Sequence, residues 1–407
     1  MIKIAVLGYG TVGSGVVEVI NTNHASINKK AGDEIEVKYV LDLRDFPGDP
    51  IQEKIVHDFD IILNDPEIRI IAEVMGGVEP AYTFTKKALL AGKSVCTSNK
   101  ELVAAHGAEL LEIARERDIN YMFEASCGGG IPIIRPLNSS LTADEIDEIA
   151  GILNGTTNYM LTKMAKEGSE YDDVLKEAQA AGYAERNPAA DVEGHDACRK
   201  IAILSSLAFG RQVDFEDIYT EGITKISAAD FKYAKAMDKA IKLLGYSRRE
   251  EDQFWAMVAP VLVDPSDPLY SVNDVFNAIF VHGNVLGNAM FYGKGAGKLP
   301  TASAVVADIV DEAKHLHRSV MSFWSTKKLE LTDISNSSRK FFVRVAETSE
   351  DKRKKAEEIF GKISFVEAGL EGEFGFVTEV MTEAEYQKKA EELKDVISMI
   401  RIRHVEY

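Results

Sequence analysis

The sequence IKIAVLGYGTVG at residues 2–13 decides the fold of the first part of the chain. Residues 2–7 are almost entirely apolar, which is typical of a central parallel strand buried on both faces. A Gly-x-Gly-x-x-Gly fingerprint follows, and a helix-like segment begins at Ser14. Such glycines allow a tight turn and let a pyrophosphate approach the free amides of the helix N-terminus. This arrangement predicts a dinucleotide-binding site made by Gly8, Tyr9, Gly10, Thr11, Val12 and Gly13.

Strands and helices alternate up to residue 124, which predicts an α/β fold with a doubly wound, Rossmann-type parallel sheet. Strands are expected at residues 35–43, 69–77, 94–97 and 121–124, with a helix at 80–91. The second strand ends near Asp42 and Arg44. An acid here would bind the ribose hydroxyls of NAD, whereas an arginine could hold the extra phosphate of NADP. The choice between NAD and NADP therefore stays open.

Two loops follow strands at the edge of the sheet where ligands of such folds bind. The first reads Ser98-Asn99-Lys100-Glu101, and its lysine is well placed to hold a carboxylate or donate a proton. The second loop, residues 125–132, contains three glycines beside a proline. Its backbone carbonyls could ligate a hard cation, although the residues alone favour a simple crossing between domains. Cys127 has no obvious histidine partner in the sequence, which disfavours a role as nucleophile.

Residues 182–200 form an acid-rich loop that leads into an apolar helix. Asp196 and Lys200 lie one helical turn apart, which a simple salt bridge would explain. Acids beside one lysine could instead indicate a site for a small molecule with an amino and a hydroxyl group. Upstream, residues 154–158 read Asn-Gly-Thr-Thr-Asn and either cap a helix at 159–166 or bind a carboxylate or phosphate.

The rest of the middle region predicts a mixed sheet that also makes a dimer interface. Strands are expected at 144–153, 255–263, 278–282 and 286–292, and helices at 171–181 and 231–244. A second glycine-rich loop at 293–304 lacks the context of a phosphate-binding P-loop. After a boundary at 331–340, the order strand, helix, strand, strand, helix, strand predicts a ferredoxin-like βαββαβ module.

The composition restricts the class of protein. The 407 residues are too many for one ordinary core, and a hydrophobic content of 45% is typical of a soluble globular protein. A net charge of -18 disfavours nucleic acid and anionic membranes as partners, because both bind clustered positive charge. No apolar run is long enough to span a membrane, and residues 1–8 do not resemble a signal peptide. The three scattered cysteines fit a reducing cytoplasm.

These motifs together resemble those of the homoserine dehydrogenases that carry a C-terminal ACT domain. The resemblance covers essentially the whole chain and is carried by residues 8–13, 98–101, 124–132, 151–158, 182–200 and 295–304. It implies an NAD(P)-dependent, reversible interconversion of L-homoserine and L-aspartate 4-semialdehyde, on the route to threonine, methionine and isoleucine. One alternative is another amino-acid-pathway dehydrogenase, which the acid-rich loop disfavours. The other is a silent nucleotide sensor, which would be expected to have lost Lys100, Asp196 or Lys200.

The resemblance also implies roles for individual residues. Lys200 resembles the catalytic lysine, Lys100 its partner and Asp196 the acid near the substrate hydroxyl. Substrate contacts are implied for Glu185, which would hold the ammonium group, and for Asp191 and Thr156. A monovalent cation, Na+ or K+, would lie mainly on backbone oxygens at Glu124, Cys127, Gly129 and Ile131. Cofactor contacts beyond the fingerprint are implied for Arg44, Gly76, Ser98, Lys100, Gly182 and Gly297.

Simple chemistry supports the lysines independently. Reduction of an aldehyde by hydride leaves an alkoxide that must take up a proton, so a lysine near that oxygen is suitable. The lysine pKa should then lie near neutrality. We expect Lys100 and Lys200 to lower each other's pKa while Asp196 orients them.

The chain is expected to divide into three domains. The first domain, residues 1–138, would bind the cofactor, and a helix at 299–318 would pack back on it. The second domain, residues 139–330, would hold the substrate and the dimer contacts. The third, residues 340–407, would form the ACT module. The assembly is expected to be a homodimer or a larger homo-oligomer. ACT domains that bind amino acids commonly have a turn with proline and glycine after the first strand, whereas residues 347–351 contain neither. L-Threonine is therefore a weak candidate effector, and dimerisation is the default role of the module.

Overall fold

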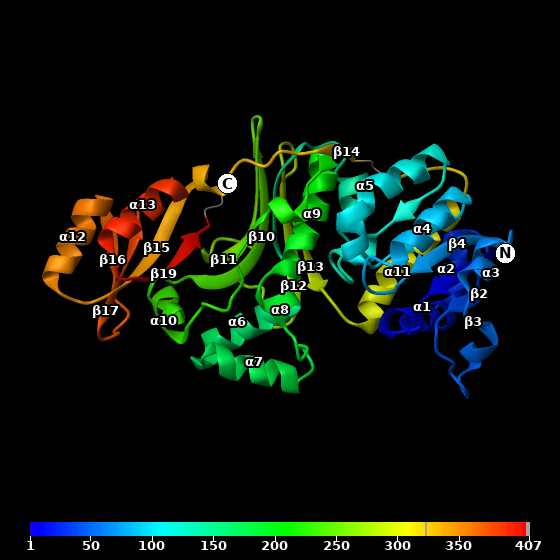
Figure 1. Ribbon diagram of the computed structural model, residues 1–407, viewed down its shortest axis with the longest axis horizontal. Coiled ribbons are helices and arrows are strands. Elements are labelled where there is room, and N and C mark those ends of the chain that lie inside the picture. The colour runs from blue at the N-terminus through cyan, green and yellow to red at the C-terminus, as the bar shows by residue number, and fades with distance from the viewer. Residues whose placement is uncertain (322–323, 404–407) are drawn as a thin grey trace.

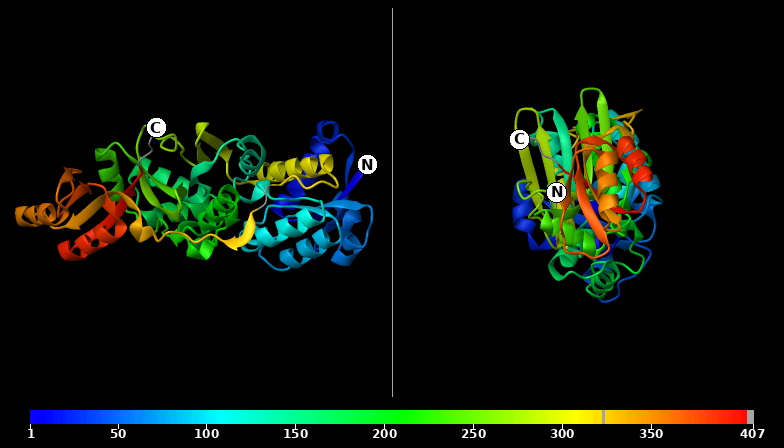
Figure 2. Two further views of the ribbon diagram at one scale, coloured as in Figure 1. Left: turned by 90° about the horizontal axis from the view of Figure 1, so that it is seen from above. Right: turned by 90° about the vertical axis from the view of Figure 1, so that its left-hand side faces the viewer.

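The computed structural model describes residues 1–321 and 324–403 of the protein. The molecule is elongated, with the first sheet at one end, the last module at the other and helix α9 (His195–Phe209) between them (Figure 1). The view from above shows the same order along the long axis (Figure 2). Within the described ranges, no helix has the length and apolar character needed to cross a membrane.

The first sheet is the predicted doubly wound parallel sheet. Its six strands lie in the order β3-β2-β1-β4-β5-β6, and every neighbouring pair is parallel. The central strand β1 (Ile2–Leu7) is buried over most of its length, as its apolar sequence predicts. The remaining strands are β2 (Ile35–Leu41), β3 (Ile55–Val56), β4 (Ile68–Glu73), β5 (Ser94–Thr97) and β6 (Tyr121–Met122). The helices of this region are α1 (Thr11–Thr22), α2 (His24–Ala31), α3 (Phe59–Leu63), α4 (Ala81–Leu90) and α5 (Lys100–Glu116).

Helix α11 (Lys298–Lys314) lies far along the chain but packs against the first sheet. Its apolar side chains share one buried cluster with β1, including Ala302, Val305 and Ile309. The approach to α1 is close, because a Cβ atom on Gly15 would lie 3.0 Å from the Cβ atom of Ala302. The first sheet is therefore completed by a helix that follows the middle sheet in the sequence.

The middle region is a mixed sheet covered by helices on one face. Its strands are β7 (Ile146–Ile152), β10 (Ala240–Glu250), β11 (Gln253–Val263), β12 (Phe276–Gly283) and β13 (Gly287–Lys294). Its helices are α6 (Gly155–Glu167), α7 (Tyr171–Ala180), α8 (Ala189–Val192), α9 and α10 (Ala228–Ala236). Short strands β8 (Arg211–Gln212) and β14 (Ser325–Lys328) pair with each other, and β9 (Tyr219–Thr220) pairs with β11. Single helical turns occur at 50–54, 124–126, 136–140, 215–217 and 334–336.

The predicted helix at 231–244 is wrong in its second half. Helix α10 begins with a capping box between Ser227 and Asp230 and ends before Asp238, which has a φ of +53°. The following residues form β10 instead. Leu243 packs in the core shared with α9, whereas Leu244 packs in the cluster on the opposite face. Burial on both faces gives a continuous apolar run, and such a run does not separate a strand from a helix.

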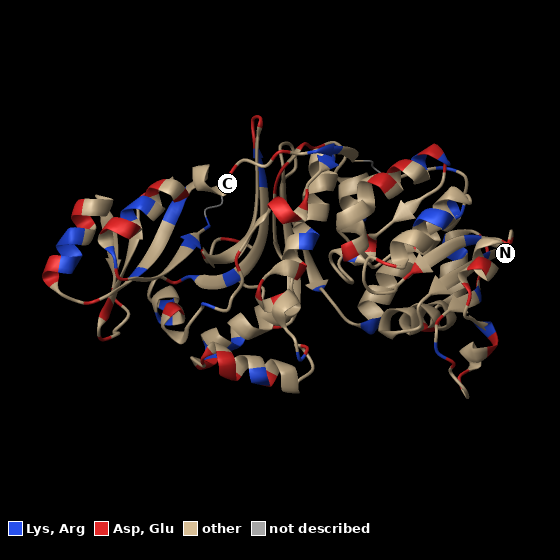
Figure 3. Ribbon diagram, in the orientation of Figure 1, with Lys and Arg blue, Asp and Glu red and all other residues tan. Residues whose placement is uncertain are grey.

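The C-terminal module has the predicted βαββαβ order but does not form a sheet of its own. Its main elements are β15 (Ser338–Ala346), α12 (Glu350–Phe360), β16 (Ile363–Val366), β17 (Glu373–Thr378), α13 (Glu383–Leu393) and β19 (Val396–Ile402), with the short β18 (Met381–Thr382) added. Strand β19 pairs in parallel with β11, so the middle sheet and the module share eleven strands. The turn after β15 places Glu347 at a φ of +92°, where glycine would be the unstrained residue. Figure 3 shows acids and bases interspersed on α12 and α13.

Replacement of Ile309 by alanine tests the contribution of α11 to the first core. Ile309 is fully buried, and we expect Ile309→Ala to lower the free energy of unfolding by about 2–5 kcal/mol through lost burial and the cavity left behind. Urea unfolding followed by circular dichroism measures this change. Ser303→Ala on the exposed face of α11 is the control and should change stability by less than about 0.5 kcal/mol. Equal effects of both variants would contradict a packing role for α11.

Candidate active site

The glycine loop between β1 and α1 fits a pyrophosphate. Gly8 has a φ of +96°, and a Cβ atom on Gly13 would lie 1.9 Å from the carbonyl oxygen of Gly8. Nothing lies within 4 Å of a Cβ atom placed on Gly10 or Gly76, so both positions face open space. Gly10 supplies no side-chain cap to α1, which leaves the first amides of the helix free for an anion. The loop therefore has the close backbone packing and the open side that a dinucleotide requires.

The residues at the end of β2 form a polar cluster beside this loop. Both carboxylate oxygens of Asp42 accept hydrogen bonds from Arg44, each at 3.0 Å, and one of them also accepts from the amide of Tyr9 at 2.8 Å. The bonds from Arg44 hold the pKa of the Asp42 carboxyl well below its usual range, although partial burial opposes this shift. The Arg44 side chain itself is 62% exposed. An anionic ligand could therefore reach Arg44 more readily than a sugar hydroxyl could reach Asp42.

A buried network joins the ends of β4 and β5 and positions the start of α5. Glu73 accepts hydrogen bonds from the Met75 amide at 2.7 Å and from the Thr97 hydroxyl at 2.6 Å. Asn99 donates to the Gly77 carbonyl at 2.6 Å and caps α5, whose first residue is Lys100. Burial raises the pKa of Glu73 to about 7. Ser98 is attached to the same network, because its amide donates to the Glu73 carbonyl at 3.3 Å.

Two lysines from different parts of the chain meet at one carboxylate. Asp196, in the first turn of α9, accepts from Lys200 at 2.7 Å and forms an ion pair with Lys100 at 3.0 Å. Asp196 and Lys200 are buried, while the Lys100 side chain is 36% exposed. Lys200 donates a second hydrogen bond to the Leu153 carbonyl at 2.8 Å. The structure therefore brings together the three residues for which catalytic roles were expected.

Asn154 also belongs to this cluster, although the sequence indicated only that its segment, residues 154–158, could cap a helix or bind an anion. Its side-chain amide donates to Asp191 at 2.7 Å and to Asp196 at 3.0 Å. Its side-chain oxygen accepts from the Thr157 amide and caps α6, which begins at Gly155 and not at the expected residue 159. Asn154 thus holds both acids next to the lysines. The Asn-Gly-Thr-Thr motif was a signal for a ligand or a cap, but it did not reveal that the cap residue spans two carboxylates.

The charges of the cluster differ from the expectation for Lys100. Burial acts to lower the Lys100 pKa, but the charge and hydrogen bond of Asp196 outweigh it and raise the pKa above its ordinary value. The expectation that Lys200 would lower the Lys100 pKa is therefore wrong, because Asp196 lies between the two ammonium groups. Burial opposes ionisation of Asp196, yet the two lysines hold its pKa well below the usual range. Burial raises the pKa of Asp191.

Other predicted site residues lie apart from this cluster or are engaged elsewhere. Glu185 is exposed, and its carboxylate forms no hydrogen bond or ion pair with a described residue. The Thr156 hydroxyl donates to the Tyr183 carbonyl at 2.6 Å, so it ties α6 to the acid-rich loop. Gly182 has a φ of +76° in that loop, and Gly297 has a φ of +123° at the start of α11.

The loop predicted to bind a cation is packed tightly between other segments. The Glu124 carboxylate accepts from the amides of Ile133, Ile134 and Arg135 at 2.6–2.9 Å, so its side chain is fully used. Burial raises the pKa of the Cys127 thiol to about 12, which agrees with the prediction that it is no nucleophile. A Cβ atom on Gly129 would lie 2.3 Å from the Gly295 carbonyl oxygen. The backbone oxygens of Cys127, Gly129 and Ile131 accept no hydrogen bond from the described part of the chain.

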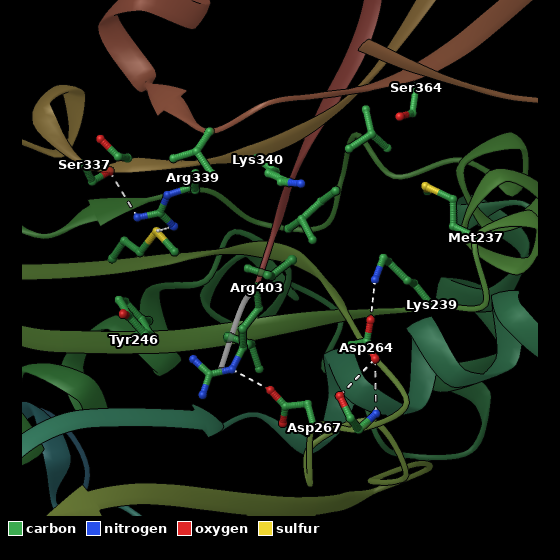
Figure 4. Close-up of a pocket in the computed structure, with 18 of the residues that line it drawn as sticks. Met237, Lys239, Tyr246, Asp264, Asp267, Ser337, Arg339, Lys340, Ser364 and Arg403 are labelled. Carbon is green, nitrogen blue, oxygen red and sulfur yellow. Dashed lines mark hydrogen bonds and ion pairs between the residues drawn. The ribbon is translucent and has the colours of Figure 1, made fainter. Parts of the chain in front are cut away.

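A cavity of about 1120 Å³ lies away from these residues, between the middle sheet and the C-terminal module (Figure 4). Its lining includes Tyr246, Arg339 and Arg403, and none of the lysine cluster. Figure 4 shows Lys239 directed toward Asp264 and Arg403 toward Asp267 across this space. These charges are paired within the protein, so the cavity offers no counterpart to the chemistry of the lysine cluster.

Comparison with known proteins identifies the family. The family model for the homoserine dehydrogenase NAD-binding domain matches residues 8–124, and that for homoserine dehydrogenase matches residues 132–310. The Bacillus subtilis homoserine dehydrogenase is 42% identical over 326 residues, which are 78% of this chain and 74% of the relative. The Pseudomonas aeruginosa homoserine dehydrogenase is 45% identical over 316 residues, which are 76% of this chain and 72% of the relative.

Solved structures agree with this result over a longer range. The crystal structure of a homoserine dehydrogenase from Thiobacillus denitrificans superimposes with a TM-score of 0.91 at 34% identity, and the match covers 99% of this chain and 98% of that chain. A hyperthermophilic archaeal homoserine dehydrogenase in complex with NADPH gives a TM-score of 0.65 at 28% identity over 76% of this chain and 97% of that chain. The chain therefore belongs to the homoserine dehydrogenase family of NAD(P)-dependent oxidoreductases.

Proposed function

We propose that Lys200, Lys100 and Asp196 carry out the proton transfer that accompanies interconversion of L-homoserine and L-aspartate 4-semialdehyde. The observation that carries this proposal is the Asp196 carboxylate, which lies between the two ammonium groups at 2.7 and 3.0 Å. The bound nicotinamide would supply or accept the hydride. The lysines would hold the substrate oxygen and exchange the proton, and Asp196 would orient them.

We assign Lys200 as the proton donor because two hydrogen bonds hold its ammonium group in a fixed position. An ammonium group has three N–H donors. Two of those of Lys200 bond to the Leu153 carbonyl and the Asp196 carboxylate. One donor is left to reach a substrate oxygen. Lys100 is more exposed and is kept cationic by Asp196, so it suits electrostatic stabilisation of a developing alkoxide.

The acids around the lysines would recognise the amino-acid part of the substrate. We propose that Asp191 and Glu185 bind its ammonium group and that the N-terminus of α6 binds its carboxylate. Asn154 holds Asp191 next to Asp196, which fixes the distance between the reacting carbon and the ammonium group. Because the Thr156 hydroxyl already donates to Tyr183, the proposal for Thr156 rests on its backbone amide.

The variant Lys200→Ala tests the central role. We expect turnover to fall by at least about 100-fold, because general acid catalysis contributes roughly 10²–10⁴-fold. Binding of the reduced cofactor, measured by its fluorescence, should be retained, since the glycine loop is untouched. Lys176→Ala on α7, where the side chain is 75% exposed, is the control and should behave like the wild type. Near-normal turnover of Lys200→Ala would contradict the role.

We propose that NADP is the better cofactor, with Arg44 as its phosphate ligand. Each oxygen of Asp42 already accepts two hydrogen bonds, whereas NAD would need this carboxylate for its ribose hydroxyls. The exposed guanidinium of Arg44 suits an added phosphate. His57, which bonds to the Asp42 carbonyl at 2.7 Å, lies beside the same position.

Steady-state kinetics of Arg44→Ala with both cofactors measures this preference. A charged hydrogen bond contributes roughly 1.5–3 kcal/mol, so the KM for NADP should rise by about 10-fold or more. The KM for NAD should change little or fall, because the Asp42 carboxylate is released. A parallel rise for both cofactors would mean that Arg44 supports the loop and does not select the phosphate.

We propose that a monovalent cation binds the backbone oxygens of Cys127, Gly129 and Ile131. Three carbonyls without a described donor in one short loop are suitable ligands for a hard cation. The buried Glu124 beside them would supply negative charge without binding the ion directly.

Assays at constant ionic strength in KCl, NaCl and choline chloride test the cation. We expect a higher rate in KCl or NaCl, because choline is too large to enter the loop. Equal rates in all three salts would leave the loop as a crossing between segments.

We propose that the edge around β13 associates with a second copy of the chain. Leu286, just before β13, and Met290 and Tyr292 on it are 55%, 40% and 54% exposed, and clustered exposed apolar side chains are typical of an interaction surface. This exposed apolar surface supports the proposed contact between two copies of the chain. L-Threonine remains the candidate effector of the C-terminal module, and its addition to the rate assay measures that effect.

A further inference from the structure

The turn that precedes α9 determines where the acids of the site lie. This α8–α9 turn, residues 192–194, directly follows Asp191 and comes just before Asp196. Gly194 is the N-cap of α9 and has a φ of +86°, which a side chain would strain. A shift of the turn would therefore move Asp191, Asp196 and Lys200 together.

A second segment presses directly on this turn. Residues 219–223, named here the brace, contact it through their backbone. The Ile223 amide donates to the Val192 carbonyl at 2.8 Å. A Cβ atom on Gly222 would lie only 2.0 Å from the same carbonyl oxygen. On the other side, a Cβ atom on Gly194 would lie 3.2 Å from the Thr220 methyl group, so the turn has no room to slide past the brace.

The brace is held in turn by the C-terminal module. The Glu221 carboxylate accepts from Arg401 on β19 at 2.7 Å and from the Tyr219 hydroxyl at 3.1 Å. The Arg401 guanidinium also lies over the Tyr219 ring, 4.9 Å from its centre. Its other nitrogens form a bidentate pair with Glu383 at the start of α13, at 2.7 and 2.9 Å. One arginine thus joins the module to the brace.

Burial holds the Arg401 side chain in one orientation. The Arg401 side chain is 2% exposed, as is that of Glu383, whereas that of Glu221 is 27% exposed. Because the Arg401 side chain is buried, its charge needs a partner within the protein. The guanidinium nitrogen that faces the brace pairs with Glu221. Strand pairing holds both sides of this contact in place. The strand that carries Arg401, β19, and the first strand of the brace, β9, both pair with β11. The brace therefore takes its position from β19 and from β11.

We propose that the Arg401–Glu221 ion pair is a positioning link through which the C-terminal module sets the geometry of the homoserine site. Arg401 and Glu221 do not touch the reacting groups in this scheme. They hold the brace, the brace holds the α8–α9 turn, and the turn holds the acids that bind substrate. The inference rests on the proposed roles of Asp191 and Asp196.

The variants Glu221→Ala and Glu221→Gln test the link in the full-length enzyme. Glu221→Ala should lower kcat/KM for L-homoserine by at least about 5-fold, within the range of coupling between distant sites. The KM for NADP should stay within about twofold, because the glycine loop is not attached to the brace. Glu221→Gln keeps an acceptor oxygen for Arg401 and Tyr219 and should give an intermediate loss. Gly222→Ala displaces the turn directly and should raise the KM for homoserine even with the ion pair intact.

The matched control is Glu373→Ala. Glu373 forms a similarly short ion pair, at 2.8 Å, with a buried arginine of the module, Arg344, but it does not contact the brace. Its thermal midpoint should fall about as much as that of Glu221→Ala, while its kcat/KM for homoserine should stay near the wild-type value. Equal catalytic losses in Glu221→Ala and Glu373→Ala would overturn the link, as would an unchanged KM in Gly222→Ala. A wild-type enzyme that fails to oxidise homoserine would instead overturn the proposed function.

Discussion

The proposed active site depends on one carboxylate shared by two lysines. Asp196 comes from the middle region, whereas Lys100 is the first residue of a helix on the Rossmann sheet. Removal of a lysine from water costs several kcal/mol, and a buried partner of opposite charge offsets much of that cost. The shared carboxylate therefore does two things. It keeps Lys100 charged, and it makes the contact between the two regions part of the geometry of the proposed site. A site of this kind exists only while both regions stay in register.

That register is maintained by contacts close to the crossing segments. Arg135, which follows the glycine loop at 125–132, pairs with Asp308 at 2.6 Å and Asp311 at 3.1 Å on α11. The amide of Gly130 donates to the carbonyl of Lys294, so the two crossing segments lie side by side. Burial and the nearby Glu124 carboxylate raise the pKa of Asp308 to about 8, and the charge of Arg135 opposes this rise. These two connections between the regions thus pass through one ionic and hydrogen-bonded junction.

Local patterns predicted much of the fold and part of the site. The strand, the glycine fingerprint and the following helix at residues 2–22 are a local signal, because the tight turn needs glycine whatever lies around it. The βαββαβ order and the pairing of Asp196 with Lys200 are likewise readable from spacing. Strand β10 could not be predicted in this way, because a strand buried on both faces shows no alternation of apolar and polar residues. The carbonyl of Leu153, the double contact of Asn154 and the charge of Lys100 depend on residues far apart in sequence, which no single stretch contains.

The shared sheet has a consequence for the biosynthesis of this chain. Strand β11 pairs with β10 along one side, and its other side is closed by β9 and β19. Strand β19 is translated long after β11, so a nascent chain carries an unpaired edge of apolar sequence until the final strand arrives. Such edges recruit strands from neighbouring molecules. The C-terminal module thus covers this edge of β11, so residues far from Lys100 and Lys200 affect the solubility of the chain during synthesis.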